Sequence, residues 1–337
     1  MSPKYAMSSE FKWRKSQSKA DSLAIAEELK LNFDVASYSV EQLADVVNSA
    51  LRIGEIELEK HGASYYAKNV EEWLDQRLLP NTVSINWDDY RKALYRSFRL
   101  LIVADIAKTD FGSSRQRDFG QRWTDFTRGF LGEIGIEKFF KQKFDAEIDL
   151  DESTVGDVST FLPSDIVKIK DNGNWRPVNT TVSIKTSKLA SMWLDIGSQL
   201  NHSNAFTFIK IGLTVDHLPS FIKKSGILEQ LVGMGKSLSE VDDSAKELAE
   251  LSSKIEDFSE LPAYISGFAW DEDFKNGELT VHQTKRKKIV VGGIGRFEKE
   301  VGDEVGGLGE IAYGKHLASL SSLRWTVSDW NELKRKI

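Results

Sequence analysis

The chain has 337 residues, of which 40% are hydrophobic and 28% are charged, with a formal net charge of −6; this composition is typical of a folded protein of about two to three domains. Cysteine is absent, which excludes disulfides, thiolate metal sites and a cysteine nucleophile, and fits the reducing cytoplasm, where we expect the protein to reside. The first residues lack the apolar run of a signal peptide and no segment is apolar enough for a transmembrane helix, so we expect no membrane association.

Most of residues 20–110 are predicted to be helical, because apolar residues recur there at helical spacing. Segment 39–62 starts with Ser39 and Gln42 at the spacing of a capping box, which predicts one long helix. A further helix is predicted over 87–108. Its predicted apolar face consists of Tyr90, Leu94, Phe98 and Leu101. We interpret these aromatics as core and the arginine side of the helix as solvated, although that side has the charge to contact DNA.

A long amphipathic helix is predicted over 122–144 ("RWTDFTRGFLGEIGIEKFFKQKF"), after a loop at 113–120. Three glycines interrupt it at positions 129, 132 and 135. Each glycine costs about 1 kcal/mol relative to alanine inside a helix. We therefore expect another part of the backbone to approach this helix closely.

Strands are predicted after residue 150. Segments 164–170 and 178–185, with the turn "DNGNW" between them, are expected to form a hairpin. Segment 205–215 ("AFTFIKIGLTV") is almost entirely apolar or β-branched, which favours a central strand buried on both faces.

The C-terminal third is predicted to be mixed. Residues 225–258 are expected to be helical, and the tail 326–337 is expected to form a short helix. Segment 289–314 is rich in glycine, and the glycines of 307–312 are interpreted as a flexible loop that could approach DNA with Arg296 and Lys299.

Three ionisable residues stand at positions where the predicted elements could bring them together. Asp165 opens the first strand of the expected hairpin, Lys185 closes the second, and Glu133 lies on the glycine-rich helix. Carboxylates suit Mg²⁺, which prefers oxygen ligands and retains several waters. A nearby ammonium group can orient an attacking water and stabilise developing negative charge. The set suits phosphodiester hydrolysis, and the main-chain carbonyl of Ile184 could complete the metal shell.

Three sequence segments resemble the PD-(D/E)xK nuclease superfamily, and within it the type II restriction endonucleases. They are "GEIGIEKFF", "LPSDIVKI" and "VSIKTSKLASMWLDI", which cover parts of residues 120–215. The resemblance implies that Asp165 binds the metal, that Lys185 is the catalytic lysine and that Glu133 is the helix acid supporting the metal site. It also implies an α/β fold with a central mixed sheet flanked by helices.

One position departs from the family pattern. Ser183 stands where the family has Asp or Glu, two residues before the lysine. Glu133 could supply the missing carboxylate, with the Ser183 hydroxyl contacting a metal-bound water. Alternatively the acid has moved, to Asp195 or Asp157, or the site is inactive. We favour Glu133.

The resemblance implies a site-specific deoxyribonuclease of a restriction-modification system that hydrolyses double-stranded DNA with Mg²⁺. Two-fold symmetry of a palindromic site then implies a homodimer, joined through 240–258 or the N-terminal helices. Thr186, Ser187 and Lys188 follow the catalytic strand, and we expect them to contact DNA.

The expected organisation is a helical N-terminal region over 1–112 and a nuclease domain over 113–337. The latter combines a catalytic core at about 120–215 with a C-terminal helical and glycine-rich extension. Segments 233–237 and 307–312 lack the context of phosphate-binding motifs, so we expect no nucleotide cofactor. The alternatives are a structure-directed repair or recombination nuclease, and a DNA-binding protein with a disabled site.

Overall fold

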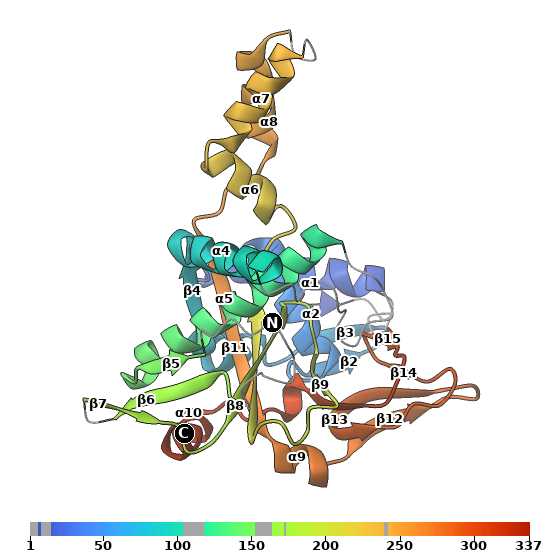
Figure 1. The fold of residues 1–337 in the computed structure, drawn as a ribbon. Helices are drawn as coiled ribbons and strands as arrows, with labels where there is room; N and C mark the ends of the chain where they lie inside the picture. The colour runs from blue at the N-terminus through green and yellow to red at the C-terminus, as the bar shows by residue number, and fades with distance from the viewer. Residues whose placement is uncertain (1–5, 8–14, 104–117, 152–163, 172, 239–241) are drawn as a thin grey trace.

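A four-stranded mixed sheet forms the centre of the molecule in the computed structural model, which describes residues 6–7, 15–103, 118–151, 164–171, 173–238 and 242–337 (Figure 1). The strand order is β4 (Thr82–Asn86), β11 (Glu260–Trp270), β10 (Ala205–Ile211) and β8 (Val182–Lys188). β10 is parallel to β8 and antiparallel to β11, and β11 is antiparallel to β4. All seven residues of β10 are buried, which confirms the prediction of a central buried strand.

The expected mixed α/β class is confirmed, and the central sheet also includes strands from outside 120–215. β4 precedes residue 112, whereas β11 follows the long helical segment. Their apolar residues belong to one hydrophobic cluster with those of β10 and the helices above it. The sheet therefore joins parts of the chain on both sides of the expected catalytic core.

Helices α4 (Trp87–Val103) and α5 (Phe119–Phe144) cover one face of this sheet. At two of the three glycines a strand packs closely against the helix, although through its side chains and not, as predicted, through its backbone. A Cβ atom on Gly132 would overlap the Thr186 side chain of β8, and one on Gly135 would lie 3.2 Å from Cβ of Ala263 in β11. Gly129 has nothing within 4 Å, so no packing within the chain explains it. These contacts set the helix directly against β8 and β11.

The N-terminal region packs against the other face of the sheet, through Leu189 and Tyr264. Its elements are β1 (Ala6–Met7), α1 (Lys15–Asn32), α2 (Val40–Arg52), β2 (Leu58–His61), β3 (Ser64–Ala67), α3 (Val70–Trp73), a π-helical turn (Leu74–Leu78) and a 3-10 turn (Leu79–Asn81). The capping box of α2 is confirmed. The prediction of helix to residue 62 is wrong, because Gly54 and Gly62 adopt positive φ angles of 78° and 61°, which end the helix and turn the β2–β3 hairpin.

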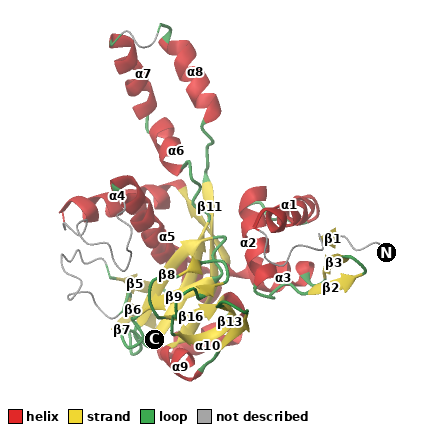
Figure 2. Ribbon diagram, turned by 90° about the vertical axis from the view of Figure 1, so that its right-hand side faces the viewer, coloured by secondary structure: helices red, strands yellow, loops and turns green. Residues whose placement is uncertain are grey.

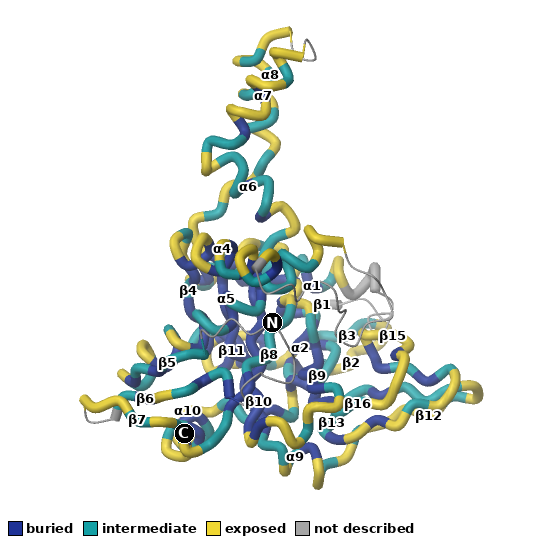
Figure 3. The backbone as a smooth tube through the Cα atoms, in the orientation of Figure 1, coloured by how far each residue is buried: buried dark blue, intermediate teal, exposed yellow. Residues whose placement is uncertain are grey.

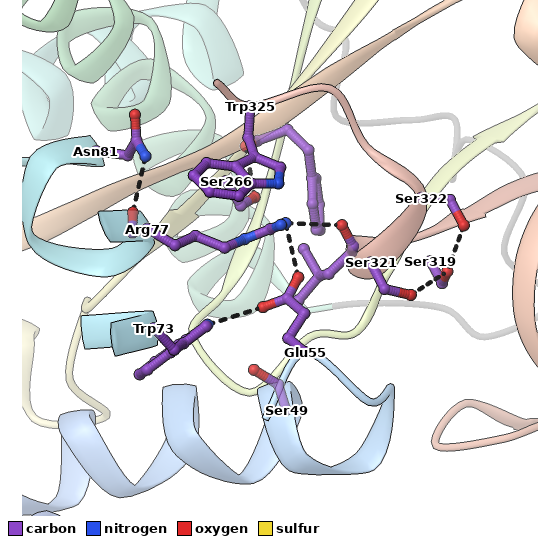
Figure 4. A network of polar contacts seen from close by, with 12 residues as sticks. Ser49, Glu55, Trp73, Arg77, Asn81, Ser266, Ser319, Ser321, Ser322 and Trp325 are labelled. Carbon is purple, nitrogen blue, oxygen red and sulfur yellow. Dashed lines mark hydrogen bonds and ion pairs between the residues drawn. The ribbon is translucent and has the colours of Figure 1, made fainter. Parts of the chain in front are cut away.

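A buried polar network joins this region to the rest of the molecule (Figure 4). Arg77 forms a 2.7 Å ion pair with Glu55, and their side chains are only 7% and 3% exposed. The guanidinium also donates to the Leu320 carbonyl at 2.8 Å and to the Tyr264 hydroxyl at 3.2 Å. The indole of Trp73 donates to Glu55 at 3.1 Å. One arginine thus connects elements that lie far apart in the sequence.

A second sheet has the order β15-β14-β13-β16-β9, with β12 also paired to β13. Its strands are β9 (Trp193–Gly197), β12 (Leu279–Gln283), β13 (Lys288–Phe297), β14 (Glu304–Val305), β15 (Gly309–Glu310) and β16 (Lys315–Ser319). The prediction of a flexible loop over 307–312 is wrong for Gly309–Glu310, which form β15. Gly293 and Gly295 in β13 have positive φ angles, and an added Cβ atom at either would overlap the backbone of residues 277–280. Glycine allows both this conformation and this close approach.

Helix α9 (Asp271–Asn276) precedes β12, and the predicted C-terminal helix is confirmed as α10 (Val327–Lys336).

The expected hairpin is also corrected. β6 (Ile166–Asp171) pairs with β7 (Asn174–Pro177) and β5 (Ile148–Leu150) in a separate three-stranded sheet. Gly173, with φ 83°, lies in the short β6–β7 connection and within the predicted turn, so the turn is confirmed, whereas the second strand of the hairpin is Asn174–Pro177 and not 178–185. β8 instead pairs with β10.

The chain between β10 and β11 forms a helical arm that projects from the body (Figure 2). Its helices are α6 (His217–Lys224), α7 (Ile227–Ser237) and α8 (Ser244–Lys254), which confirms the helical prediction for this segment. The two ends of the arm meet where the Gly212 amide donates to the Pro262 carbonyl at 2.8 Å. At its base, the buried imidazole of His217 lies 2.9 Å from the Tyr90 hydroxyl of α4 and 3.1 Å from the Thr124 hydroxyl of α5. Among the residues that the structure describes, no helix is long and apolar enough to span a membrane.

Candidate functional site

Asp165 lies where β6 separates from β8. Its amide donates to the Val182 carbonyl at 2.8 Å. Its carboxylate oxygen Oδ2 accepts the Ile184 amide at 2.5 Å and the Ser183 hydroxyl at 3.3 Å. The side chain therefore takes the place of a neighbouring strand along this edge of β8.

The same geometry fixes the direction of the Ile184 carbonyl. The backbone groups of a strand alternate between its two edges, and the Val182 carbonyl and the Ile184 amide both face Asp165. The Ile184 carbonyl therefore points to the edge occupied by Asp165, while the opposite edge of β8 is paired with β10. A main-chain oxygen and a carboxylate are thus brought to one place.

Glu133 reaches the site from α5. Its Oε2 accepts a hydrogen bond of 2.9 Å from Nη1 of Arg96 in α4. Burial raises the pKa of Glu133 to about 8, against the opposing charge of Arg96, and the carboxylate of Asp165 raises it further. Burial likewise raises the pKa of Asp165, opposed by its hydrogen bond from the Ile184 amide. At both carboxyl groups, burial therefore outweighs the neighbouring cation, which is Arg96 for Glu133 and Lys185 for Asp165.

Lys185 lies close enough to Asp165 for their charges to act on each other. Its ammonium group donates to Oε1 of Gln199 at 2.6 Å. Burial lowers the pKa of Lys185, with the carboxylates of Asp165 and Asp195 opposing the change. The structure thus brings together Glu133, Asp165 and Lys185, the three residues singled out in the sequence.

The oxygen atoms at this site fit a Mg²⁺ ion that keeps several waters better than a metal ion held by protein ligands alone. In the described parts of the chain, no three His, Asp or Glu side chains lie close enough together to hold a metal ion. Mg²⁺, however, is usually bound by one or two carboxylates together with several waters. Two buried carboxylates with raised pKa values beside a main-chain carbonyl fit that coordination and do not fit an all-protein cage.

Ser183 and the two candidate replacement acids have different positions. The Ser183 hydroxyl donates to Asp165. Asp195, on β9, is ion-paired with Lys315 of β16 and accepts the Gly197 amide at 2.9 Å. Asp157 lies outside the described residues.

Two further residues near the site were not predicted. Asp151 follows β5, and its amide donates to the Asp165 carbonyl at 2.9 Å; its charge acts on both Glu133 and Asp165. Gln199 comes from the turn after β9 and has no sequence signal that marks it. Arg96 was recognised only as part of a basic helix face, whereas it binds Glu133 and donates to the Asp151 carbonyl at 2.7 Å.

The three residues expected to contact DNA differ in accessibility. The Thr186 hydroxyl is buried against Gly132 of α5. The Ser187 hydroxyl lies 2.5 Å from that of Ser191. Lys188 is exposed.

The site combines two buried carboxylates, a main-chain carbonyl and a lysine at one edge of a mixed sheet. The chemistry assigned to it depends on these contacts alone. Comparison of the chain with protein-family models, curated proteins and solved structures found no match.

Proposed function

We propose that the protein is a Mg²⁺-dependent DNA endonuclease that cuts duplex DNA at a specific sequence, in the manner of a type II restriction enzyme. The observation that carries this proposal is that Glu133, Asp165 and Lys185 lie beside the edge of β8 at Ile184. The position of Asp165 at the divergence of two strands supports it, because phosphate can reach such an edge.

Asp165, Glu133 and the Ile184 carbonyl would hold the metal ion. Bound there, Mg²⁺ would polarise a phosphoryl oxygen and lower the pKa of a coordinated water. The Ser183 hydroxyl and the Ile184 amide hold Oδ2 of Asp165, which leaves Oδ1 for the ion. Ser183 thus orients the carboxylate and does not replace the family's acid, and Glu133 supplies the second carboxylate.

Lys185 would act on the attacking water and on the phosphate. Burial lowers its pKa, which favours the neutral amine as a proton acceptor more than in an exposed lysine. In its charged form it stabilises negative charge on the phosphate. Gln199 accepts its hydrogen bond and holds the side chain at the site.

A structure-directed nuclease is the second candidate. The observation that favours it is the outer face of α4, where exposed aromatic side chains lie beside cationic ones. Such a face suits a strand whose bases are unstacked. A DNA-binding protein with a disabled site would share the fold and would bind DNA without cutting it.

The test is incubation of the pure protein with long duplex DNA of known sequence, in Mg²⁺ and in EDTA. Lys185→Ala is compared with Lys168→Ala, which removes an exposed lysine from neighbouring β6. Discrete Mg²⁺-dependent fragments that are lost only in Lys185→Ala support a sequence-specific nuclease. A smear, or cutting confined to branched substrates, supports the second candidate. Binding without cutting in any divalent metal would contradict both nuclease proposals.

Duplex cutting at a palindromic site also predicts a homodimer. Sedimentation equilibrium with and without cognate DNA measures this directly. A monomer that cuts one strand at a time would contradict the type II arrangement and leave the catalytic site intact.

A further inference from the structure

The outer surface of α4 carries two adjacent rows of side chains. We call the six exposed residues that form it the α4 outer face: Arg91, Lys92, Tyr95, Phe98, Arg99 and Ile102. Residues three and four positions apart are neighbours on a helix surface. The inner side of the same helix is buried, with Tyr90, Leu94 and Leu101 each at most 3% exposed, as Figure 3 shows for the alternation along α4.

One row is cationic and leads to the candidate site. Lys92, Arg96 and Arg99 follow one another at i, i+4 and i+7, and the middle residue, Arg96, binds Glu133. Lys92 and Arg99 lie about 6 Å and about 4.5 Å from Arg96 along the helix axis. The only acidic residues of α4 lie in its first turn. The row therefore places positive charge on both sides of the carboxylate site.

The neighbouring row is aromatic and apolar. Tyr95 is 68% exposed, Ile102 is 59% exposed and Phe98 is 42% exposed. The prediction that Phe98 belongs to the core is wrong for this reason. The inner edge of its ring is held by Trp123, with centroids 5.4 Å apart, so the ring has a fixed orientation and still presents part of its surface to solvent.

We infer that the α4 outer face binds a nucleic-acid strand with unstacked bases, which stack on Tyr95 and Phe98 while Lys92 and Arg99 contact its phosphates. Proteins that hold single strands combine cations that follow the backbone with aromatic rings on which bases stack. The inference rests on the second candidate, the structure-directed nuclease, for its link to catalysis, because Arg96 connects the face to Glu133. It assigns the substrate class of that candidate: DNA that has an unpaired strand beside the cleavage site.

The test is fluorescence anisotropy with a labelled single-stranded 12-mer and the matching duplex, in EDTA so that no cleavage occurs. Tyr95→Ala and Phe98→Ala are each expected to weaken single-strand binding about fivefold or more, since base–aromatic stacking is lost. Tyr95→Phe and Phe98→Tyr retain a ring and are expected to retain affinity. The double variant Lys92→Ala/Arg99→Ala is expected to reduce the slope of log K against log salt by about 1.4 for single strands.

Matched controls come from the arm. Leu231→Ala/Met234→Ala removes two exposed apolar side chains from α7, and Lys246→Ala removes an exposed cation from α8. Phe98 packs on Trp123 and is only 42% exposed, so thermal unfolding of each variant verifies that it folds. Binding that falls equally in the controls, or that is unchanged in the α4 variants, overturns the inference.

The outcomes separate the inference from the nuclease proposal. If the wild type cleaves DNA and the α4 variants bind normally, the nuclease proposal stands and the proposal of strand binding by the α4 outer face is rejected. If single-strand binding depends on α4 and no divalent metal supports cleavage, the proposal of strand binding stands and the nuclease proposal is rejected. Binding of the wild type to anionic vesicles but not to either DNA would reject both.

Discussion

The hydroxyl of Ser183 donates to Oδ2 of Asp165 across 3.3 Å, at the position where the resembled nucleases carry a second acid. A carboxylate at position 183 would therefore face the carboxylate that the serine now orients. The hydrogen bond between Ser183 and Asp165 shows how a serine at position 183 can hold the Asp165 carboxylate in place without a second acid.

Ser183→Asp is expected to lower the free energy of unfolding in EDTA, because two buried carboxylates would repel each other. Mg²⁺ is expected to restore more stability to this variant than to the wild type. Thermal unfolding with and without Mg²⁺ measures both effects, and Ser183→Asn provides a control of similar size without charge. An equal Mg²⁺ response in all three proteins would argue against a metal at Asp165.

Above pH 8, where Glu133 is ionised, Arg96→Met is expected to destabilise the protein by about 3 kcal/mol, because it leaves the mostly buried carboxylate without its ion-pair partner. Glu133→Gln in the same chain is expected to recover most of this loss. Urea unfolding of the two single variants and the double variant gives the coupling energy. If the double variant loses as much free energy of unfolding as the two single variants lose together, Arg96 and Glu133 are not coupled.

The raised pKa of Glu133, about 8, predicts a pH dependence of stability. A carboxyl group with a raised pKa binds its proton more tightly in the folded state. Its contribution is therefore present at low pH and is lost as the pH rises from the unfolded value of about 4.5 to about 8. We expect the stability difference between Glu133→Gln and the wild type to grow in favour of the variant over this range in EDTA. A difference that does not change with pH would contradict the burial of this carboxyl group.

Two glycines of α5 provide a matched pair of substitutions. Gly132→Ala is expected to destabilise the protein by about 1–3 kcal/mol, because its methyl group would overlap Thr186. Gly129→Ala, with nothing within 4 Å, is expected to stabilise the helix by up to about 1 kcal/mol. Chemical denaturation compares them. Equal effects would show that α5 does not press on β8 at Gly132.

Lys210 offers a prediction outside the site. This lysine of β10 is fully buried and donates to the Ser49 hydroxyl at 2.7 Å. Burial lowers its pKa to about 7, with the Glu55 carboxylate opposing. The folded state therefore releases the proton more readily than the unfolded chain, so stability rises with pH from about 7 to about 10.5. Lys210→Met is expected to be more stable than the wild type at pH 7, with a gain that shrinks by pH 9.5. A variant that is less stable at both pH values would indicate that the ammonium group stabilises the fold.

The sequence predicted best the features that local pattern controls. The helix of Glu133, the buried strand of Lys210 and the capped C-terminal helix follow from periodicity and end signals within each segment. The turn of the hairpin was predicted correctly and its second strand was not, because β7 ends at Pro177 and the strand of Lys185 pairs with β10, a partner that the local pattern does not reveal.

The three central residues of the site could be predicted from the sequence, whereas the residues that bind their side chains could not. Glu133, Asp165 and Lys185 belong to segments with a recognisable pattern. Arg96 lies 37 residues from Glu133 in the chain, and Gln199 meets Lys185 through a turn of the second sheet. Contacts of this kind depend on tertiary packing, which periodicity within one segment does not encode.

The arm between β10 and β11 bears on how the sheet folds. These two strands pair antiparallel, and the ends of the excursion meet at Gly212 and Pro262, so they form a hairpin whose loop is an entire helical subdomain. Closing a disordered loop of this length costs about 2 kcal/mol more than closing a tight turn, because the entropy grows with the logarithm of loop length. Helices that form early within the arm shorten the effective loop and reduce that barrier. The rate at which the central sheet assembles should therefore follow the helicity of a segment that projects from the body (Figure 2).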